Sequence, residues 1–290
     1  MSPAARFSAH QKTLLTGRVD LPRARRIVVK FGTQVVLDAE GRPALSRLYG
    51  LMETVAELRR RGGQPVLVSS GAIGLGARQL GIKKPTGLPQ KQACAAAGQG
   101  QLMSIYQEGF ARMGFCAAQV LLTEDDFADP VRHANLRHTL DTLLELGAIP
   151  VLNENDTVST LELERSFNGH TPVFSDNDHL SALVANHLEA DLLVLLSDVT
   201  ALHTRNPGLH PDATPLTEVP FGTPLQADLK GTSGRGRGGM VSKVEAARVA
   251  ARAGVPVVLA SGLVFRILEQ ILAGDPVGTF FLAAPQGARS

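Results

Sequence analysis

Ile27-Val-Val-Lys-Phe-Gly-Thr33 is a short apolar run that reaches a lysine and then breaks into a glycine turn. Similar runs rich in Val, Ile and Leu recur along the chain. Continuous apolar strands of this kind are typical of parallel sheets that are buried on both faces. The expected strands are residues 27–30, 65–69, 115–122, 149–152, 192–197 and 256–260.

Longer segments between these runs have the spacing of amphipathic helices. They cover residues 45–61, 91–113, 132–146, 177–189 and 239–253, and a further helix is expected to start near Ala72. This alternation predicts an α/β fold with a mainly parallel central sheet and helices on both faces. Ligands in such folds bind at the carboxyl ends of the strands, so the residues that follow each strand are the candidate functional ones.

The bulk composition indicates a soluble protein with a sizeable core. Of the 290 residues, 44% are hydrophobic, and no low-complexity linker divides the chain; either one large domain or two modest ones is expected. Cys94 and Cys116 alone indicate neither a disulfide framework nor a zinc site. No apolar run approaches the roughly 20 residues that span a bilayer, and no signal region is present, which predicts a cytoplasmic protein with no membrane partner.

The net charge of +2 includes a basic cluster at Arg18 and residues 23–26. This cluster is either an arm that contacts nucleic acid or a solvated lead-in to the first strand. A nucleic-acid surface usually interleaves basic and aromatic residues, and this chain has no Trp and only two Tyr. The lead-in is therefore the favoured interpretation, and no nucleic-acid partner is expected.

Gly234-Arg-Gly-Arg-Gly-Gly-Met-Val-Ser-Lys243 runs from flexible glycines into a helical pattern. Backbone N–H groups, the positive end of the helix dipole and Lys243 together would form a cradle for an anion such as phosphate. Residues 234–239 also fit the G-x-G-x-x-G dinucleotide pattern, but they follow no apolar strand, and the strand at 256–260 ends in Ser261-Gly262 rather than in an acidic residue. A flexible surface loop before an ordinary helix remains the alternative.

Polar residues at two other strand ends extend this chemistry. Lys30 closes the first strand, either as a functional cation or as an ordinary surface lysine. In Ser69-Ser70-Gly71, Ser70 is expected to cap the next helix, while neighbouring N–H groups either meet a carboxylate or serve that cap alone.

Two clusters of Asn and Asp follow, at Asn153-Glu-Asn-Asp156 and at Asp176-Asn-Asp178. Such clusters bind a metal or an ammonium group, or they serve only turns and caps. Together with the lysines, they describe phosphoryl transfer to a small zwitterionic acceptor, a reaction that needs positive charge and in-line positioning more than covalent help. No Walker G-x-x-x-x-G-K-[ST] and no H-R-D, D-F-G, H-E-x-x-H or G-x-S-x-G motif is present, so a different class of kinase is indicated.

These segments, in this order, resemble the amino-acid kinases, in particular the branch that phosphorylates glutamate. The resemblance spans about residues 26–285 and rests on residues 27–33, 68–73, 92–103, 119–123, 153–156, 176–182, 193–198 and 238–243. It implies a carbamate-kinase-like three-layer sandwich. It also implies an N-terminal extension at 1–22 and a single kinase domain at 23–285, with an acceptor-binding lobe at about 23–190 and a nucleotide-binding lobe at about 191–285.

The activity implied by the resemblance is ATP-dependent phosphorylation of the γ-carboxylate of L-glutamate. The products would be L-glutamyl 5-phosphate and ADP, in the first step of proline biosynthesis. Such an acceptor needs no strong base because its carboxylate is already ionised at neutral pH. Mg²⁺ is implied as the cofactor and would be bound through ATP, with no metal site of the protein's own.

The same resemblance assigns roles to residues of three kinds. Lys30 and Lys243 would flank the transferred phosphoryl group, and Asp178 would hold both lysines. Glutamate would be bound by Ser70, Gly71, Asp156, Asp176 and Asn177. The nucleotide would be bound by the two lysines and by Ser197, Asp198, Arg237, Gly238, Gly239, Met240, Val241 and Ser242.

The chain also departs from the family's usual pattern. Ser175 stands where Gly is usual, Arg237 where Thr is usual, and Ala201 and His203 where Gly and Tyr are usual, which puts the nucleotide contacts in doubt. No C-terminal RNA-binding-like domain of the PUA type is expected. A homo-oligomer (dimer or tetramer), feedback inhibition by proline and a glutamyl-phosphate reductase partner are further expectations.

Two alternatives to this function remain open. The first is a relative that acts on acetylglutamate, aspartate, carbamate or a nucleotide monophosphate, against which residues 153–156 argue. The second is a catalytically silent sensor that keeps the fold, against which both lysines and Asp178 argue.

Overall fold

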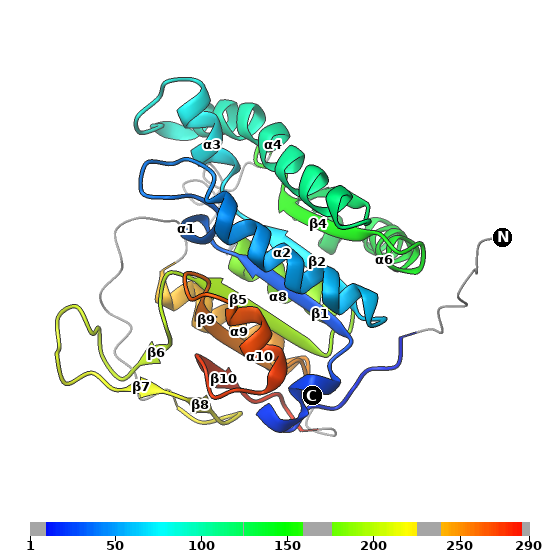
Figure 1. Ribbon diagram of the computed structural model, residues 1–290, viewed down its shortest axis with the longest axis vertical. Coiled ribbons are helices and arrows are strands. Elements are labelled where there is room, and N and C mark those ends of the chain that lie inside the picture. Colours follow the sequence, from blue (N-terminus) through cyan, green and yellow to red (C-terminus); the bar gives the residue numbers. More distant parts are fainter. Residues whose placement is uncertain (1–9, 124, 159–175, 225–238, 286–290) are drawn as a thin grey trace.

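A computed structural model describes residues 10–123, 125–158, 176–224 and 239–285 of the chain (Figure 1). Its centre is an eight-stranded sheet with the strand order β3-β4-β2-β1-β5-β9-β10-β8. The pairing is parallel throughout except between β9 and β10, which are antiparallel. The sheet strands are β1 (Arg26–Phe31), β2 (Gln64–Ser69), β3 (Ala117–Leu122), β4 (Ile149–Glu154), β5 (Leu192–Ser197), β8 (Glu218–Val219), β9 (Val257–Ser261) and β10 (Thr279–Phe281), and β6 (Leu202–His203) pairs with β7 (Pro215–Leu216) in a separate two-stranded sheet.

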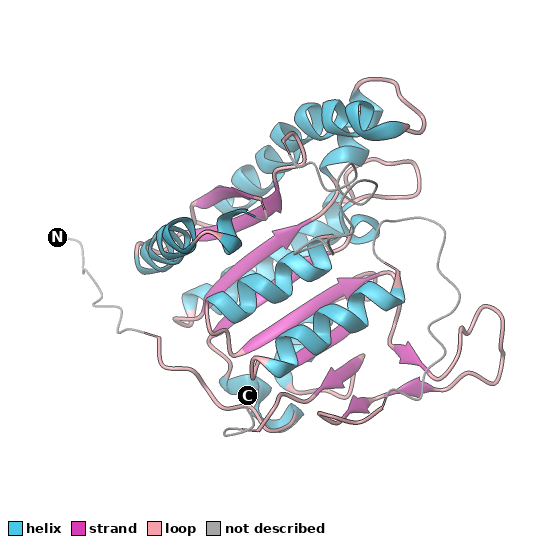
Figure 2. Cartoon of the chain, turned by 180° about the vertical axis from the view of Figure 1, so that it is seen from behind, coloured by secondary structure: helices cyan, strands magenta, loops and turns pink. Residues whose placement is uncertain are grey.

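Helices cover both faces of the sheet and produce three layers (Figures 1 and 2). Helices α2 and α10 lie on the face turned to the viewer in Figure 1, and α8 and α9 lie on the face seen in Figure 2. The described helices are η1 (Arg18–Arg23), α1 (Thr33–Val36), α2 (Leu45–Arg60), α3 (Ala72–Gln79), α4 (Gly87–Arg112), α5 (Asp125–Ala128), α6 (Pro130–Glu145), α8 (Asn177–His187), α9 (Met240–Arg252) and α10 (Ile267–Ala273).

Alternate residues of β1 enter two different hydrophobic cores, because successive side chains of a strand point to opposite faces. Ile27 and Val29 join the core built with α2 and α10. Val28 joins the core built with α6, α8 and α9. Lys30 has the same parity as Val28, so its side chain leaves the sheet on the side of α8 and α9. The sheet therefore delivers this lysine to the layer in which its partners lie.

The predicted fold class is confirmed. All six expected strands and the five main expected helices are present, and α3 begins at Ala72 as expected. One local prediction is wrong: Ser70 does not cap α3. The N-cap is Gly71, which has φ +112° and forms no side-chain capping bond. Glycine reaches this left-handed backbone conformation without a Cβ clash.

The first part of the predicted N-terminal extension is outside the described residues, but residues 10–22 are described and lead to β1. Asp191, which is fully buried, fastens this segment to the sheet. Its carboxylate accepts hydrogen bonds from the backbone N–H groups of Thr13 (2.5 Å), Arg25 (2.7 Å) and Arg26 (2.9 Å). The division at residues 22 and 190 remains a proposal, since one continuous sheet spans both parts.

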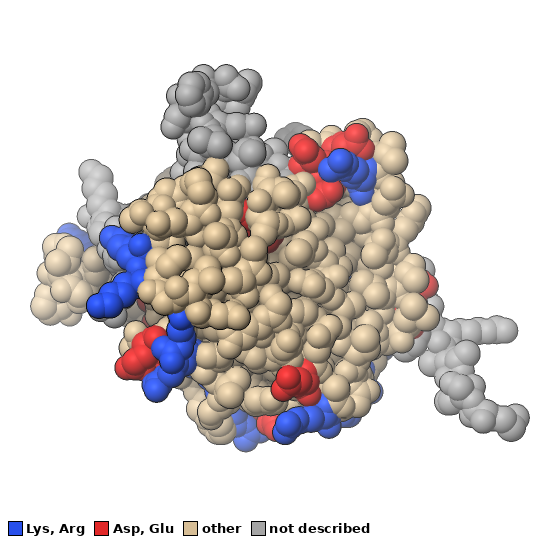
Figure 3. Space-filling model, turned by 90° about the horizontal axis from the view of Figure 1, so that it is seen from above, with Lys and Arg blue, Asp and Glu red and all other residues tan. Residues whose placement is uncertain are grey.

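Charged residues on the face over α3 and α4 lie mainly near its rim, in groups of mixed sign (Figure 3). Much of the surface seen in that view carries neither kind of charge. Among the described residues, no helix combines the length and the apolar character needed to cross a membrane.

Helices α3 and α4 touch backbone to backbone at two glycines. A Cβ on Gly98 would lie 1.9 Å from the carbonyl oxygen of Ala72, and one on Gly76 would lie 1.7 Å from that of Cys94. Backbone atoms cannot swing aside as a flexible side chain can. Any larger residue must therefore separate the two helices.

We expect Gly98→Ala to lower the free energy of unfolding by about 1–3 kcal/mol, the usual cost of overpacking. Gly100→Ala on the same helix is the matched control, because nothing lies within 4 Å of its added Cβ. Replacing a helical glycine by alanine there should raise the stability by about 0.5–1 kcal/mol. Urea unfolding of both variants measures the difference, and equal stabilities would contradict the close contact.

Candidate active site

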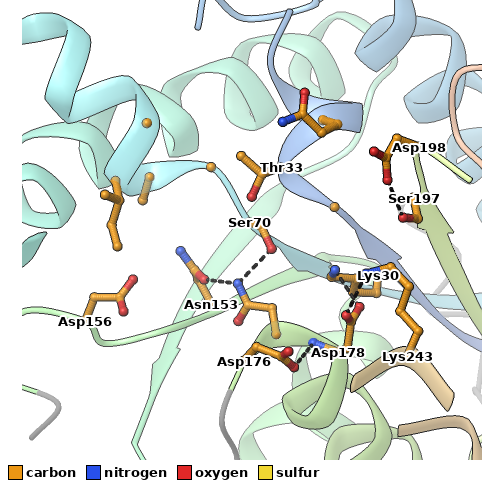
Figure 4. A pocket seen from close by; sticks show the side chains of 17 residues that line it. Lys30, Thr33, Ser70, Asn153, Asp156, Asp176, Asp178, Ser197, Asp198 and Lys243 are labelled. Atoms are coloured by element: carbon orange, nitrogen blue, oxygen red, sulfur yellow. Dashed lines mark hydrogen bonds and ion pairs between the residues drawn. The ribbon is translucent and has the colours of Figure 1, made fainter. Parts of the chain in front are cut away.

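The strand ends meet in one pocket at the carboxyl edge of β1, β2, β4 and β5 (Figure 4). The pocket brings together ten of the predicted site residues from segments far apart in the sequence. These are Lys30, Ser70, Gly71, Asp156, Asp176, Asn177, Asp178, Ser197, Asp198 and Lys243. The parallel strand order explains the convergence, since all four strands end on the same edge.

Lys30, Asp178 and Lys243 form a buried charged triad. Lys30 Nζ lies 2.5 Å from Asp178 Oδ1, and Lys243 Nζ lies 3.1 Å from Asp178 Oδ2. The exposed fractions are 5% for Lys30, 1% for Asp178 and 6% for Lys243. One carboxylate therefore orients two ammonium groups at the floor of the pocket.

The pKa of Asp178 lies below its ordinary value of 3.8. Burial acts to raise it, but the attraction of Lys30 and Lys243 and their hydrogen bonds outweigh that effect. Asp178 is therefore ionised at neutral pH. With two ammonium groups against one carboxylate, the triad carries an excess of positive charge that suits a phosphate.

The N-terminus of α8 sets the position of Asp178. Asp176 is the N-cap residue, and its Oδ1 accepts hydrogen bonds from the backbone N–H groups of Asp178 (3.0 Å) and His179 (3.1 Å). Its other oxygen accepts a hydrogen bond from Ser242 Oγ in the first turn of α9. Asp176 lines the pocket, but these partners make it a clamp between α8 and α9.

One side of the pocket, called the acceptor side below, is formed by the amide and hydroxyl groups of Ser70, Asn153 and Asn177 together with Asp156. Asn177 Nδ2 donates to the carbonyl oxygen of Ser69 (3.0 Å), to Ser70 Oγ (3.1 Å) and to Asn153 Oδ1 (2.9 Å). Asn177 Oδ1 is buried and has no hydrogen-bond partner among the described residues. Asp156 lies on the same side of the pocket (Figure 4). This side of the pocket therefore presents oxygens of the kind that accept hydrogen bonds from an ammonium group.

The other side of the pocket is formed by Gly32 and by the end of β5. Ser197 Oγ donates to Asp198 Oδ1 at 3.0 Å. Gly32 N–H donates to the carbonyl oxygen of Leu196 at 2.9 Å. A Cβ on Gly32 would lie 3.0 Å from that oxygen and 3.7 Å from Lys30 Nζ. The glycine keeps the space beside the lysine clear.

The predicted nucleotide residues are only partly placed at the pocket. Gly239 is the N-cap of α9, and Met240, Val241 and Ser242 form its first turn, but of this segment only Lys243 is among the residues that line the pocket. Arg237 and Gly238 lie outside the described residues, as does Ser175. Ala201 and His203 lie next to or within β6, where His203 Nδ1 is 3.0 Å from the carbonyl oxygen of Ala201.

Seven further residues line the pocket that the site prediction did not include: Gly32, Thr33, Gln34, Ala72, Ile73, Gly74 and Asn153. Most of them directly follow predicted strands, within the same motifs that carried the predicted residues. Position after a strand was thus the signal that would have found them.

The donor set of the pocket bears on how magnesium is bound. No group of three or more His, Cys, Asp or Glu side chains with metal-binding spacing occurs among the described residues. Asp178 is held by two lysines and Asp176 by its capping bonds, so neither carboxylate is a ready metal ligand. This donor set fits an ion that arrives with a nucleotide rather than one held by the protein alone.

The three-layer fold and the lysine–aspartate–lysine pocket fit an enzyme of phosphoryl transfer. A sequence model of the amino acid kinase family matches residues 25–261, which shows a kinase. The chain therefore belongs to the amino acid kinase family.

Curated relatives with high similarity are glutamate 5-kinases. The chain is 48% identical to that of Gloeobacter violaceus over 266 residues, which covers 91% of this chain and 70% of the relative. It is 45% identical to that of Moorella thermoacetica over 268 residues, covering 91% and 68%. Identity to that of Thermus thermophilus is 46% over 261 residues, covering 90% and 68%.

Solved structures of low sequence identity share the fold. Isopentenyl phosphate kinase of T. acidophilum, in a product complex, matches with a TM-score of 0.60 and 17% identity, covering 88% of this chain and 99% of that one. UMP kinase of Bacillus anthracis matches with a TM-score of 0.55 and 14% identity, covering 90% and 97%. These likenesses concern the architecture alone.

Proposed function

We propose that this enzyme transfers the γ-phosphoryl group of ATP to the γ-carboxylate of L-glutamate. The products are L-glutamyl 5-phosphate and ADP, and the reaction is the first step of proline biosynthesis. The observation that carries the proposal is the pocket in which the charged triad faces a set of acceptors for a zwitterion. The similarity to glutamate 5-kinases supports the choice of acceptor.

The charged triad supplies the electrostatic part of the reaction. Lys30 and Lys243 stabilise the negative charge that develops on the transferred phosphoryl group, and Asp178 keeps both ammonium groups in place before the substrate arrives. The nucleophile is a carboxylate oxygen, which is ionised at neutral pH. The site therefore needs no general base. The buried carboxylate of Asp178 instead positions the two lysines.

Glutamate is oriented by the acceptor side of the pocket. The buried Asn177 Oδ1 and the carboxylate of Asp156 are acceptors for the ammonium group. Ser70 and the N–H groups at Gly71 and Ala72, at the start of α3, are suited to a carboxylate of the substrate. This places the γ-carboxylate toward the lysines.

ATP binds on the side of Ser197, Asp198 and the first turn of α9, with Gly239 to Lys243 against its phosphates. Arg237 and Gly238, which the resemblance also assigns to the nucleotide, lie outside the described residues. Mg²⁺, bound through those phosphates, neutralises part of their charge when present. The proposal includes no protein metal site.

Further parts of the proposal concern the setting of the enzyme. We place it in the cytoplasm, as a homo-oligomer that proline inhibits and whose acyl phosphate passes to a reductase. An acyl phosphate is reactive, so a partner that consumes it promptly is chemically reasonable. These parts rest on the resemblance to the family.

The test is ADP release by the purified chain with ATP, Mg²⁺ and one acid at a time: L-glutamate, N-acetylglutamate, L-aspartate, carbamate and UMP. Trapping with hydroxylamine identifies an acyl phosphate by forming the hydroxamate. We expect L-glutamate to give by far the highest turnover and a γ-glutamyl hydroxamate. Preference for another acceptor, or no turnover by the folded protein, would refute the proposal.

A further inference from the structure

Gln99 lies on α4, outside the residues that line the active-site pocket, but contacts one of them. Asn153 Nδ2 donates a hydrogen bond of 2.8 Å to Gln99 Oε1. We propose that Gln99 is a positioning residue for the acceptor: through Asn153 it fixes the amide of Asn177, so that Asn177 Oδ1 faces the ammonium group of the substrate. This inference rests on the proposed function.

The orientation of the Asn153 amide follows from its neighbours. Asn153 is 3% exposed, and its Oδ1 accepts hydrogen bonds from the backbone N–H of Glu154 (2.9 Å) and from Asn177 Nδ2 (2.9 Å). Rotating this amide by 180° would bring two donor groups face to face. In this orientation Asn153 Nδ2 needs an acceptor, and the side-chain oxygen Oε1 of Gln99 supplies it.

The Asn177 amide is also oriented by its neighbours, because its nitrogen must face hydrogen-bond acceptors. Its Nδ2 faces the carbonyl oxygen of Ser69, Ser70 Oγ and Asn153 Oδ1, and the reversed amide would place its oxygen against two carbonyl oxygens. Asn177 Oδ1 is therefore turned the other way and is the buried acceptor without a partner among the described residues. Its complement is an N–H donor from the ligand, which the ammonium group of an amino acid supplies.

Helix α4 supports the acceptor side at a second point. Tyr106 is seven residues, about two helical turns, beyond Gln99 and thus lies near the same face of α4. Its hydroxyl group and Ser69 Oγ share a hydrogen bond of 2.8 Å. Burial raises the pKa of Tyr106, against the opposing effect of Ser69, so the hydroxyl keeps its proton. Gln99 thus contacts Asn153 and Tyr106 contacts Ser69, and both of these residues accept a hydrogen bond from Asn177 Nδ2.

Loss of the Gln99 acceptor leaves a buried amide N–H of Asn153 without a partner. Rotation of the Asn153 amide then becomes favourable. It turns the N–H group of Asn153 toward Asn177 Nδ2 and so disturbs the position of Asn177 Oδ1, which receives the ammonium group of the substrate. The lysines and the nucleotide side make no hydrogen bond with Gln99 in the described structure. The consequence is weaker binding of the acceptor with little change in the chemical step.

The experiment compares Gln99→Met, which keeps the length of the side chain but removes its amide, with Gln101→Met as the control. Gln101 is an exposed glutamine on the same helix. We expect the KM for L-glutamate to rise about tenfold in Gln99→Met, the equivalent of one unpaired buried polar group. The kcat and the KM for ATP should stay within about twofold of wild type. Gln99→Leu serves as the second variant if the methionine variant does not fold.

A double-mutant cycle separates positioning from a general structural effect. In an Asn153→Ala background, Gln99→Met should raise the KM for glutamate by less than about twofold, because the residue through which Gln99 acts is gone. An equal rise in both backgrounds, an unchanged KM in the single variant, or equal losses in kcat and in the use of ATP would overturn the inference.

Failure of the proposed function is recognised separately, in the wild type. If the wild type prefers another acid, the proposed acceptor is wrong. The change in KM between Gln99→Met and the wild type, measured with the preferred acid, still decides the role of Gln99. If the wild type phosphorylates no acid, both proposals fall together.

Discussion

Lys243→Met and Lys30→Met are each expected to lower kcat by about two to four orders of magnitude, the scale for removing one preorganised electrostatic donor. Each substitution removes one of the two ammonium groups held by Asp178. The remaining carboxylate then faces the transferred phosphoryl group with only one cation beside it. Steady-state turnover with saturating ATP and glutamate measures the effect.

Lys83→Met is the matched control for both lysine variants. Lys83 is exposed and lies outside the residues that line the pocket. Its turnover should stay close to that of the wild type. If Lys30→Met or Lys243→Met keeps more than about a tenth of the wild-type kcat while remaining folded, the triad does not carry the transfer step.

Asp178→Asn is expected to reduce both activity and stability. It leaves two buried ammonium groups beside a neutral amide, and removing one partner of a buried ion pair usually costs about 3–5 kcal/mol. Turnover should fall at least about a hundredfold, because the lysines lose the group that positions them. Asp275→Asn, at an exposed aspartate, is the control.

The stability difference between wild type and Asp178→Asn should depend on pH in a defined direction. The folded-state pKa of Asp178 is lowered, so its stabilising contribution is complete above its ordinary value of 3.8 and is lost as the pH falls through the folded pKa. Urea unfolding of both proteins at pH 7 and in the acid range should therefore show the gap narrowing at low pH. A constant gap would mean that the carboxylate charge does not stabilise the folded state.

Much of the fold was predictable because its strands are continuous apolar runs. The runs at 27–30 and 192–197 consist almost entirely of adjacent branched apolar side chains. Such runs are typical of strands in a sheet that is buried on both faces. The parallel order then places every strand end on one edge. This explains how Lys30, Ser70 and Asp178, far apart in the sequence, could be grouped in advance.

The short elements could not be predicted in the same way. Strands β8 and β10 have two and three residues, and their pairing depends on neighbours rather than on any local pattern. Helix α1 has four residues, too few to show helical periodicity. Side-chain preference predicts Ser70 as the cap of α3, whereas the backbone turn at Gly71 forms the N-cap.

Gln99 shows a different limit of the sequence. Nothing in the run from Gln92 to Met103 distinguishes it from its neighbour Gln101. The distinction comes from which side of α4 faces β4, and that depends on how α4 packs on α3. A residue that acts through another becomes visible only when the hydrogen bonds between them are placed in space.

The glycine contact between α3 and α4 also has a consequence for any motion of the pocket wall. With no side chain between Gly76 and Gly98, the two helices have no layer in which one can slide on the other. We therefore expect α3 and α4 to move as one rigid unit. Gly71 to Gly74, which line the pocket, lie at the start of α3, and Gln99 lies on α4. Any closing motion of this wall over a bound substrate would carry them together as one rigid part.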